Sequence, residues 1–304
     1  MKEKKLLRLL PFGALGIALL ALLYFSPQVS LAVQDGLTLC YRTIFPSLFP
    51  FFVLSTLLIS LGFAELSSRV LERPMRVLYR LDGRCAPALL LGFLGGYPVG
   101  ARTLLSLYQE GSCSKEEAER LLGFCNNCGP AFILSVAGST VLESRKAGLL
   151  IYLIHVLSAL CAGLCFRGKS LPRKMPHKAM EKKPDLVSAF VAAVQAAFSS
   201  MLSVCSFVVF FTVLLRPLRS FTQSGLLIGF AELFNGICSL QPTKAGFIAA
   251  AALIGWGGLS VHAQTLALLC DTDLSLRHYF KGKAIQAILS AALAILTVIF
   301  LPWQ

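Results

Sequence analysis

The chain has 304 residues, of which 56% are hydrophobic and 14% charged, with a mean hydropathy of +0.73 and a net charge of +13. Because an average soluble domain carries about 25% charged residues, this composition excludes a soluble globular protein, a disordered chain and a fibrous protein. The class that remains is an all-α polytopic membrane protein.

The N-terminal segment begins with basic residues and continues as an apolar run over residues 9–25. Both a cleaved signal peptide and a retained first transmembrane helix have this order. Because further apolar spans follow, we interpret residues 1–35 as a retained N-terminal transmembrane helix. Cleavage would leave the rest of the topology unchanged.

Apolar segments of about 20 residues are long enough to cross a bilayer as helices. The predicted full spans are 7–25, 37–62, 86–110, 145–166, 186–212, 223–240 and 283–302. Two further apolar segments, 114–142 and 243–270, are interrupted by helix breakers at 126–130 and 255–258. Each arm of about 13 residues is too short to cross alone, so we predict two re-entrant helical hairpins.

Most of the Lys and Arg residues fall in loops that share one side of this layout. The positive-inside rule therefore predicts a multi-pass membrane protein with a cytoplasmic N-terminus. Residues 167–185 are predicted to be a basic cytoplasmic linker, and residues 64–82 an interfacial amphipathic helix.

The linker separates two halves, 36–166 and 186–304, which share the order span, broken span, hairpin, span. Residues 92–97 resemble residues 229–234, and residues 122–124 resemble 254–256. By the charge pattern the halves have opposite orientations, which predicts two inverted repeats of the kind that many secondary transporters use. Chance similarity between apolar sequences is the alternative.

Polar residues at the predicted breaks are candidates for binding a small polar solute, because they both donate and accept hydrogen bonds. These candidates are Tyr97, Asn126, Asn127, Gly129, Glu232, Asn235, Ser260, His262 and Gln264. Glu232 is the costliest, since a charge at the bilayer centre costs about 2.5–3.5 kcal/mol. Arg102 is its predicted partner in a structural or gating pair. Helix capping by the asparagines, packing of Tyr97 and a structural hydrogen bond to His262 are the alternatives.

The spacing of Cys125 and Cys128 is that of a metal or redox motif, but no second pair lies nearby. No Ser-His-Asp order, zinc spacing or phosphate loop stands out, so no enzyme, catalytic residue, metal or cofactor is predicted. The basic residues lack interleaved aromatics, so nucleic-acid binding is not predicted either.

Three motifs carry a family resemblance: FPSLFPF at 45–51, GFLGGYPVGA at 92–101 and CNNCGPAFI at 125–133. They resemble motifs of the sporulation integral membrane proteins of endospore-forming bacteria, in the nucleoside-recognition, or Gate-domain, membrane family. Cys128 stands where that family has a small polar residue. The resemblance implies a plasma-membrane protein needed for spore formation, at the cortex stage, and it implies no particular substrate.

We therefore expect a transporter-like protein that moves or gates a small polar solute, with a nucleoside-like solute as one form. The alternative is a non-transporting scaffold that recruits cortex-assembly proteins through 64–82 or 167–185. The expected partners are the lipid bilayer, the solute, and either further copies of the chain or sporulation membrane proteins.

Overall fold

The computed structural model describes residues 2–168 and 185–300, and every regular element in these ranges is a helix. This confirms the predicted all-α class. Within these ranges, five helical segments are long and apolar enough to cross a membrane: Ser26–Phe63, Arg145–Leu164, Leu186–Arg219, Lys244–Leu269 and Arg277–Phe300. The predicted linker lies almost wholly outside the described residues.

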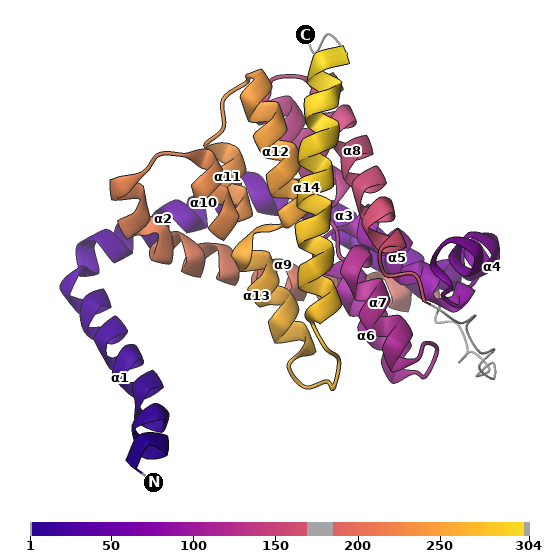
Figure 1. Ribbon diagram of the computed structural model, residues 1–304, viewed down its shortest axis with the longest axis horizontal. Helices are drawn as coiled ribbons and strands as arrows, with labels where there is room; N and C mark the ends of the chain where they lie inside the picture. The colour runs from indigo at the N-terminus through magenta and orange to yellow at the C-terminus, as the bar shows by residue number, and fades with distance from the viewer. Residues whose placement is uncertain (1, 169–184, 301–304) are drawn as a thin grey trace.

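The N-terminal helix α1 (Lys2–Tyr24) extends away from the rest of the molecule (Figure 1). The next segment is long and continuous. It consists of α2 (Ser26–Leu39), a π-helical turn (Cys40–Ile44), α3 (Phe45–Leu58) and a second π-helical turn (Ile59–Phe63).

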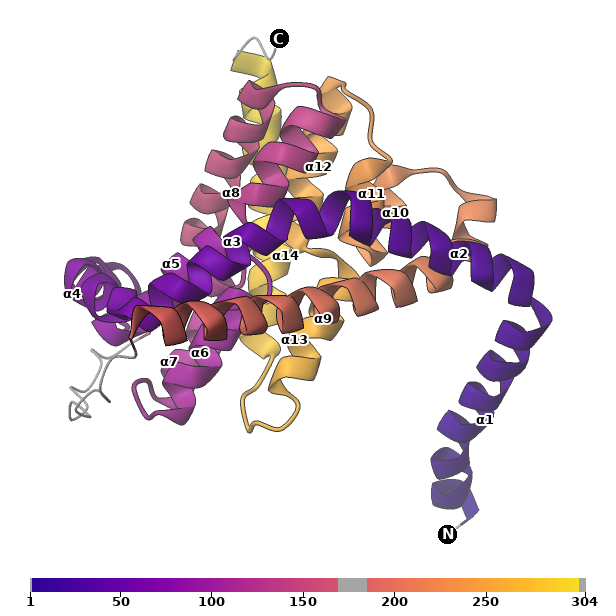
Figure 2. The same cartoon turned by 180° about the vertical axis from the view of Figure 1, so that it is seen from behind.

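This segment lies beside α9 (Leu186–Phe221), and the pair crosses one face of an upright bundle (Figure 2). The two are antiparallel, because Gly36 packs against Val209 while Phe45 lies 6.4 Å from Phe198 between ring centroids. A Cβ at Gly36 would lie 3.0 Å from the Val209 Cα, so a residue without a side chain permits this approach.

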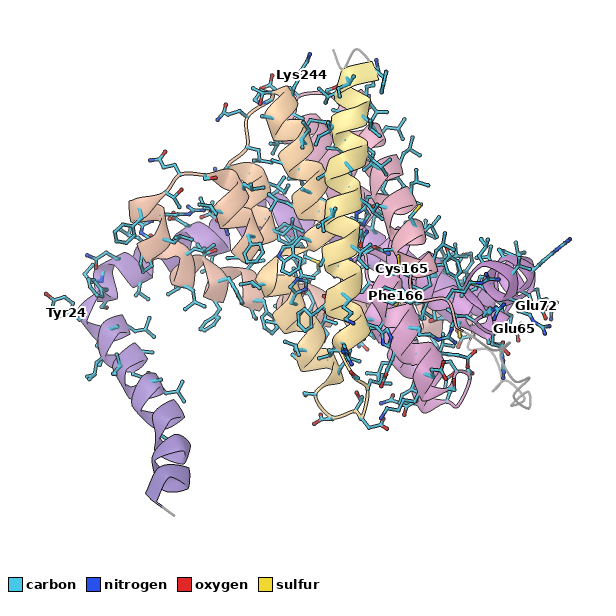
Figure 3. The ribbon with its side chains drawn as sticks, in the orientation of Figure 1. Tyr24, Glu65, Glu72, Cys165, Phe166 and Lys244 are labelled. Carbon is cyan, nitrogen blue, oxygen red and sulfur yellow. The ribbon has the colours of Figure 1, made fainter. Side chains whose placement is uncertain are left out.

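A basic helix lies at the edge of the molecule, formed by α4 (Ala64–Pro74) and a π-helical turn η3 (Met75–Tyr79). Figure 3 shows Glu65 and Glu72 at its outer side. Met75 and Tyr79 are buried against the core. A 3₁₀ turn (Gly83–Cys85) then leads to the next helix. The helix expected over 64–82 is present, and its interfacial position stays a prediction.

Two helical hairpins occupy segments that the sequence presents as single spans. In the first, α5 (Ala86–Gly95) folds back on α6 (Val99–Gln109), and in the second, α10 (Gly225–Ala231) folds back on α11 (Leu233–Cys238). Facing glycines bring the arms together: Gly92 meets Gly100, and Gly229 meets Gly236. The predicted full spans 86–110 and 223–240 are therefore wrong.

The predicted hairpin 114–142 is also wrong, because its arms lie end to end. Helix α7 (Lys115–Cys125) runs parallel to α14 (Arg277–Phe300), with Gly123 against Gly282 and Asn127 bonded to Gln286. The chain then continues as a π-helix, η5 (Ala131–Val141), packed along α8 (Arg145–Leu164). Together α7 and η5 form one broken crossing.

The predicted hairpin 243–270 is wrong too, because its arms also lie end to end. Helix α12 (Lys244–Trp256) starts near the end where α14 finishes (Figure 3), and α13 (Gly258–Leu269) continues toward the other end (Figure 1). Gly255 packs against Ser290, and Thr265 bonds Tyr279 at 3.1 Å, so the segment stays antiparallel to α14 throughout. Left-handed φ angles at Gly257 and Gly258 offset the helix without reversing the chain.

Each half therefore holds a long helix, a hairpin, a broken crossing and a span. The corresponding spans α8 and α14 are antiparallel, since Phe166 lies beside His278 while Ser158 bonds Ser290 at 2.8 Å. Inverted repeats require such antiparallel pairs, and the repeat itself stays a prediction.

Several basic residues meet at one end of the bundle. Arg167 donates to the Val77 carbonyl at 3.1 Å, Arg120 donates to the Tyr79 carbonyl at 3.4 Å, and Lys115 pairs with Asp273 at 2.9 Å. The positive-inside rule predicts that this end faces the cytoplasm.

Asp273 should make this end of the bundle sensitive to acid. Hydrogen bonds from Tyr108 (2.7 Å) and Lys115 (2.9 Å) hold the pKa of its carboxyl below the usual 3.8. Because the folded pKa is the lower one, the stabilisation is present above pH 3.8 and is lost as pH falls through the folded pKa. Asp273→Asn should therefore unfold at a lower temperature than wild type at neutral pH. The two proteins should unfold at the same temperature once the pH lies below the folded pKa of Asp273. Asp271→Asn is the matched control, and an equal effect of both variants at neutral pH would contradict the prediction.

Candidate functional site

Four chain breaks meet near the middle of the bundle. The α5–α6 tip touches the α7–η5 break, where a Cβ on Gly96 would lie 2.6 Å from the Gly129 nitrogen. The α12–α13 break touches both hairpin tips, since a Cβ on Gly257 would lie 2.9 Å from the Tyr97 hydroxyl and one on Gly258 would lie 2.9 Å from the Leu233 nitrogen. The breaks that carry the polar candidates therefore lie together, although the hairpins and crossings differ from the predicted ones.

A buried lysine organises the polar centre. Lys283 is fully buried, and its Nζ donates to the Gln286 side-chain oxygen at 2.8 Å and to the Tyr97 hydroxyl at 3.4 Å. Gln286 in turn donates to Asn127 Oδ1 at 3.0 Å. The only partners that the described residues offer Lys283 are therefore neutral, which is costly for a buried ammonium group.

His155 closes the same network from α8. Its Nε2 accepts from the Cys128 backbone nitrogen at 3.1 Å, and its Nδ1 lies 3.3 Å from Gln286 Nε2. His155 therefore fixes a free peptide group of the α7–η5 break. His155 thereby connects α8 both to that break and to α14.

Glu232 caps helix α11. Its carboxylate accepts from the backbone nitrogens of Phe234 (3.2 Å) and Asn235 (2.7 Å), from Asn235 Nδ2 (2.7 Å) and from the Ser260 hydroxyl (3.2 Å). A negative charge at the N-terminus of a helix is stabilised by the backbone N–H groups of the first turn, which have no partner within the helix. Glu232 is fully buried.

The predicted Arg102–Glu232 pair is not formed among the described residues. Arg219 of α9 is linked to Glu232 only through Asn235: Arg219 donates to Asn235 Oδ1 at 2.6 Å, and Asn235 donates to the carboxylate. Asn235 also donates to Thr212 at 2.9 Å. Arg102 lies in α6, on the other hairpin, and the tertiary structure supplies Glu232 with nearer donors.

Asn126 and His262 belong to a third cluster. Asn126 donates to Thr265 at 2.9 Å, while Thr265 and His262 both contact the Tyr279 hydroxyl, at 3.1 and 2.9 Å. Trp256 packs edge-on against His262, with ring centroids 4.4 Å apart. His262 therefore has the structural hydrogen bond that was its alternative interpretation.

A small cavity lies between the breaks, lined by Tyr97, Gly129, Gln264 and apolar walls that include Phe132 and Phe234. About 20 Å³ is open to the centre of a water molecule, which is room for about one water. Gln264 is 5% exposed, and its Nε2 has no hydrogen-bond partner in the described part of the chain. Asn126 Oδ1 and His262 Nε2 are likewise buried without partners there.

Sequence reasoning missed Lys283, Gln286, Thr265 and Tyr279. Lys283 is the first residue of the predicted span 283–302, so it was expected at the membrane surface, whereas in the structure α14 begins six residues earlier, at Arg277. Gln286 could have indicated a buried polar pair, because residues three apart share one face of a helix. Within 2–168 and 185–300, no group of three or more His, Cys, Asp or Glu side chains is placed to hold a metal.

The fold and the site define an integral, multi-pass membrane protein whose helix breaks meet at a buried polar centre. Residues 41–166 match the Gate family model, described as nucleoside recognition. The chain is similar to "Sporulation integral membrane protein YlbJ" of Bacillus subtilis (strain 168), with 29% identity over 318 residues that cover 89% of this chain and 78% of that protein. The predicted resemblance is thereby confirmed. No solved structure matches the chain.

Proposed function

We propose that this protein is a transporter-like membrane protein of sporulation that moves or gates a small polar solute at the meeting point of its chain breaks. The observation that carries the proposal is the buried cavity beside Tyr97 and Gln264, where the Gln264 amide nitrogen has no hydrogen-bond partner among the described residues. The name of the Bacillus relative supports the sporulation role. A place in cortex formation stays a prediction.

The chemistry of the cavity favours a neutral polar or amphiphilic solute. An unpartnered buried amide is costly, and a solute with a hydrogen-bond acceptor would relieve that cost at Gln264. Aromatic walls at Phe132 and Phe234 would pack against its apolar part. Since the cavity holds about one water, a larger solute requires separation of contacts such as Gly96 with Gly129. Alternating access between two halves provides such a motion.

Gln264→Leu should abolish most solute flux and leave the fold intact. The Gln264 amide nitrogen makes no hydrogen bond within the described residues, so the substitution deletes no such protein contact. Loss of one buried hydrogen bond to the solute, at about 1–2 kcal/mol, corresponds to a reduction of about 5- to 30-fold. The measurement is uptake by proteoliposomes of labelled nucleosides, amino acids and small carboxylates, with unfolding followed in parallel.

Gln195→Leu is the matched control, because Gln195 is an exposed glutamine on α9. It should transport as wild type does. If no solute in the panel moves with wild-type protein, or if Gln264→Leu matches wild type, the transport proposal fails. A scaffold would keep full sporulation with Gln264→Leu, whereas a transporter would not.

A further inference from the structure

An open groove of about 640 Å³ lies at the basic edge of the molecule, far from the polar centre. Five of its lining residues are arginines and one is acidic: Arg69, Arg73, Arg76, Arg80, Arg167 and Glu72. None of these residues takes part in the cavity described above. The groove therefore needs its own explanation.

Helix geometry places three of the arginines in one stripe. Arg69, Arg73 and Arg76 follow at spacings of four and three residues along α4 and η3, which matches the helical repeat of 3.6. Arg80 comes directly after η3, where its left-handed backbone ends the helix. The fifth, Arg167, follows α8 and reaches the groove by donating to the Val77 carbonyl at 3.1 Å. That carbonyl is available because the last carbonyls of a helix lack partners within it.

The groove has a firm base. Tyr79 is buried and its hydroxyl donates to the Leu160 carbonyl of α8 at 3.2 Å. Arg120 of α7 donates to the Tyr79 and Arg80 carbonyls at 3.4 and 3.3 Å. The stripe is thus attached to two helices of the bundle, so its arginines have a fixed spacing at the backbone.

Among the residues that the structure describes, the lining of the groove holds more arginines than acidic residues. Glu72 is the acidic residue described there, and it lies 3.9 Å from Arg76. Residues 169–184, which follow Arg167 in sequence, include six Lys or Arg residues and a single acid, Glu181. Like charges at helical spacing repel each other. An anion from outside the chain would offset this repulsion.

Apolar side chains on the same helix indicate where that anion lies. Leu66, Val70, Val77 and Leu78 of α4 and η3 are exposed, at 59, 67, 57 and 46%. A helix with such apolar residues beside arginines is typical of a bilayer surface. We propose that the groove binds the phosphate groups of anionic phospholipids, held by bidentate guanidinium hydrogen bonds.

The test uses the full chain in neutral detergent, titrated with phosphatidylglycerol or with phosphatidylcholine of the same acyl chains, and bound lipid is counted by native mass spectrometry. Arg73→Gln with Arg76→Gln should weaken phosphatidylglycerol binding about 30-fold, since each basic residue near an anionic surface contributes about fivefold. Phosphatidylcholine should bind both proteins equally. Arg145→Gln with Arg277→Gln is the matched control, because both arginines are exposed and outside the groove.

Three results would overturn the proposal. In the first, the groove and control variants lose the same affinity, which makes the effect one of net charge. In the second, inorganic phosphate at millimolar concentration displaces the lipid, which assigns the groove to a free anion. In the third, wild type does not bind phosphatidylglycerol but binds polyglutamate, which assigns the groove to an acidic protein segment. Neither solute flux nor the Gln264→Leu variant enters this test, so it is independent of the transport proposal.

Discussion

Glu232→Ala should lower the free energy of unfolding by about 3–5 kcal/mol, because it leaves several buried donors without an acceptor. The carboxylate accepts from two backbone nitrogens of α11, from Asn235 Nδ2 and from the Ser260 hydroxyl. Each buried donor left unsatisfied costs about 1–3 kcal/mol. These donors lie in a fully buried place, where water cannot easily replace the lost oxygens.

The loss is measured by unfolding in mixed micelles with increasing SDS. Glu110→Ala, at an exposed glutamate after α6, should leave the transition unchanged. Glu232→Gln should be intermediate, since its amide group would set a donor against the backbone donors of α11. If Glu232→Ala unfolds at the same SDS fraction as the control, the cap contributes nothing. A transport defect in Glu232 variants is therefore interpretable only beside such unfolding data.

Gly92→Ala should also lower the free energy of unfolding, by about 3 kcal/mol or more, because the added methyl group forces two backbones apart. A Cβ at Gly92 would lie 1.7 Å from the Cys125 carbonyl oxygen and 2.9 Å from its carbon. Neither atom is the end of a flexible side chain, so the α5–α6 hairpin must move away from α7. That movement would also disturb the adjoining contact between Gly96 and Gly129.

Unfolding in SDS measures this effect too, and solute flux measures its consequence for the polar centre. Gly13→Ala is the matched control, because nothing lies within 4 Å of a Cβ at Gly13 in α1. Alanine favours helix over glycine by about 1 kcal/mol, so the control should be neutral or slightly more stable. Wild-type stability in Gly92→Ala would show that the hairpin does not depend on this contact.

Much of the local structure follows from short-range chemistry. Asp185 begins α9 by accepting from the backbone nitrogens of Val187 and Ser188. Ser114 and Glu117 form a capping box at the start of α7. The predicted helix breakers at 126–130 and 255–258 do interrupt helices, around 126–130 and 257–258.

The direction in which the chain leaves each break was not predictable in this way. A glycine or proline removes helical hydrogen bonds and does not specify whether the next helix reverses or continues. Gly92 and Gly100 let α6 return along α5, whereas α7 and η5 follow α14 and α8 in one direction. The assignments of hairpins and crossings were exchanged for this reason.

The sequence by itself determined the class of protein, its helical content, the positions of the breaks and the concentration of polar residues at them. Only the tertiary structure decided which segments turn back, that Lys283 and Gln286 share the centre with Asn127, and that Arg219 bonds Asn235, the residue that donates to Glu232. The physical reason is how far apart along the chain the interacting residues lie. Caps and breaks depend on atoms a few residues apart, whereas the partners of Lys283 and Gln286 include Tyr97 and Asn127, 186 and 159 residues away along the chain.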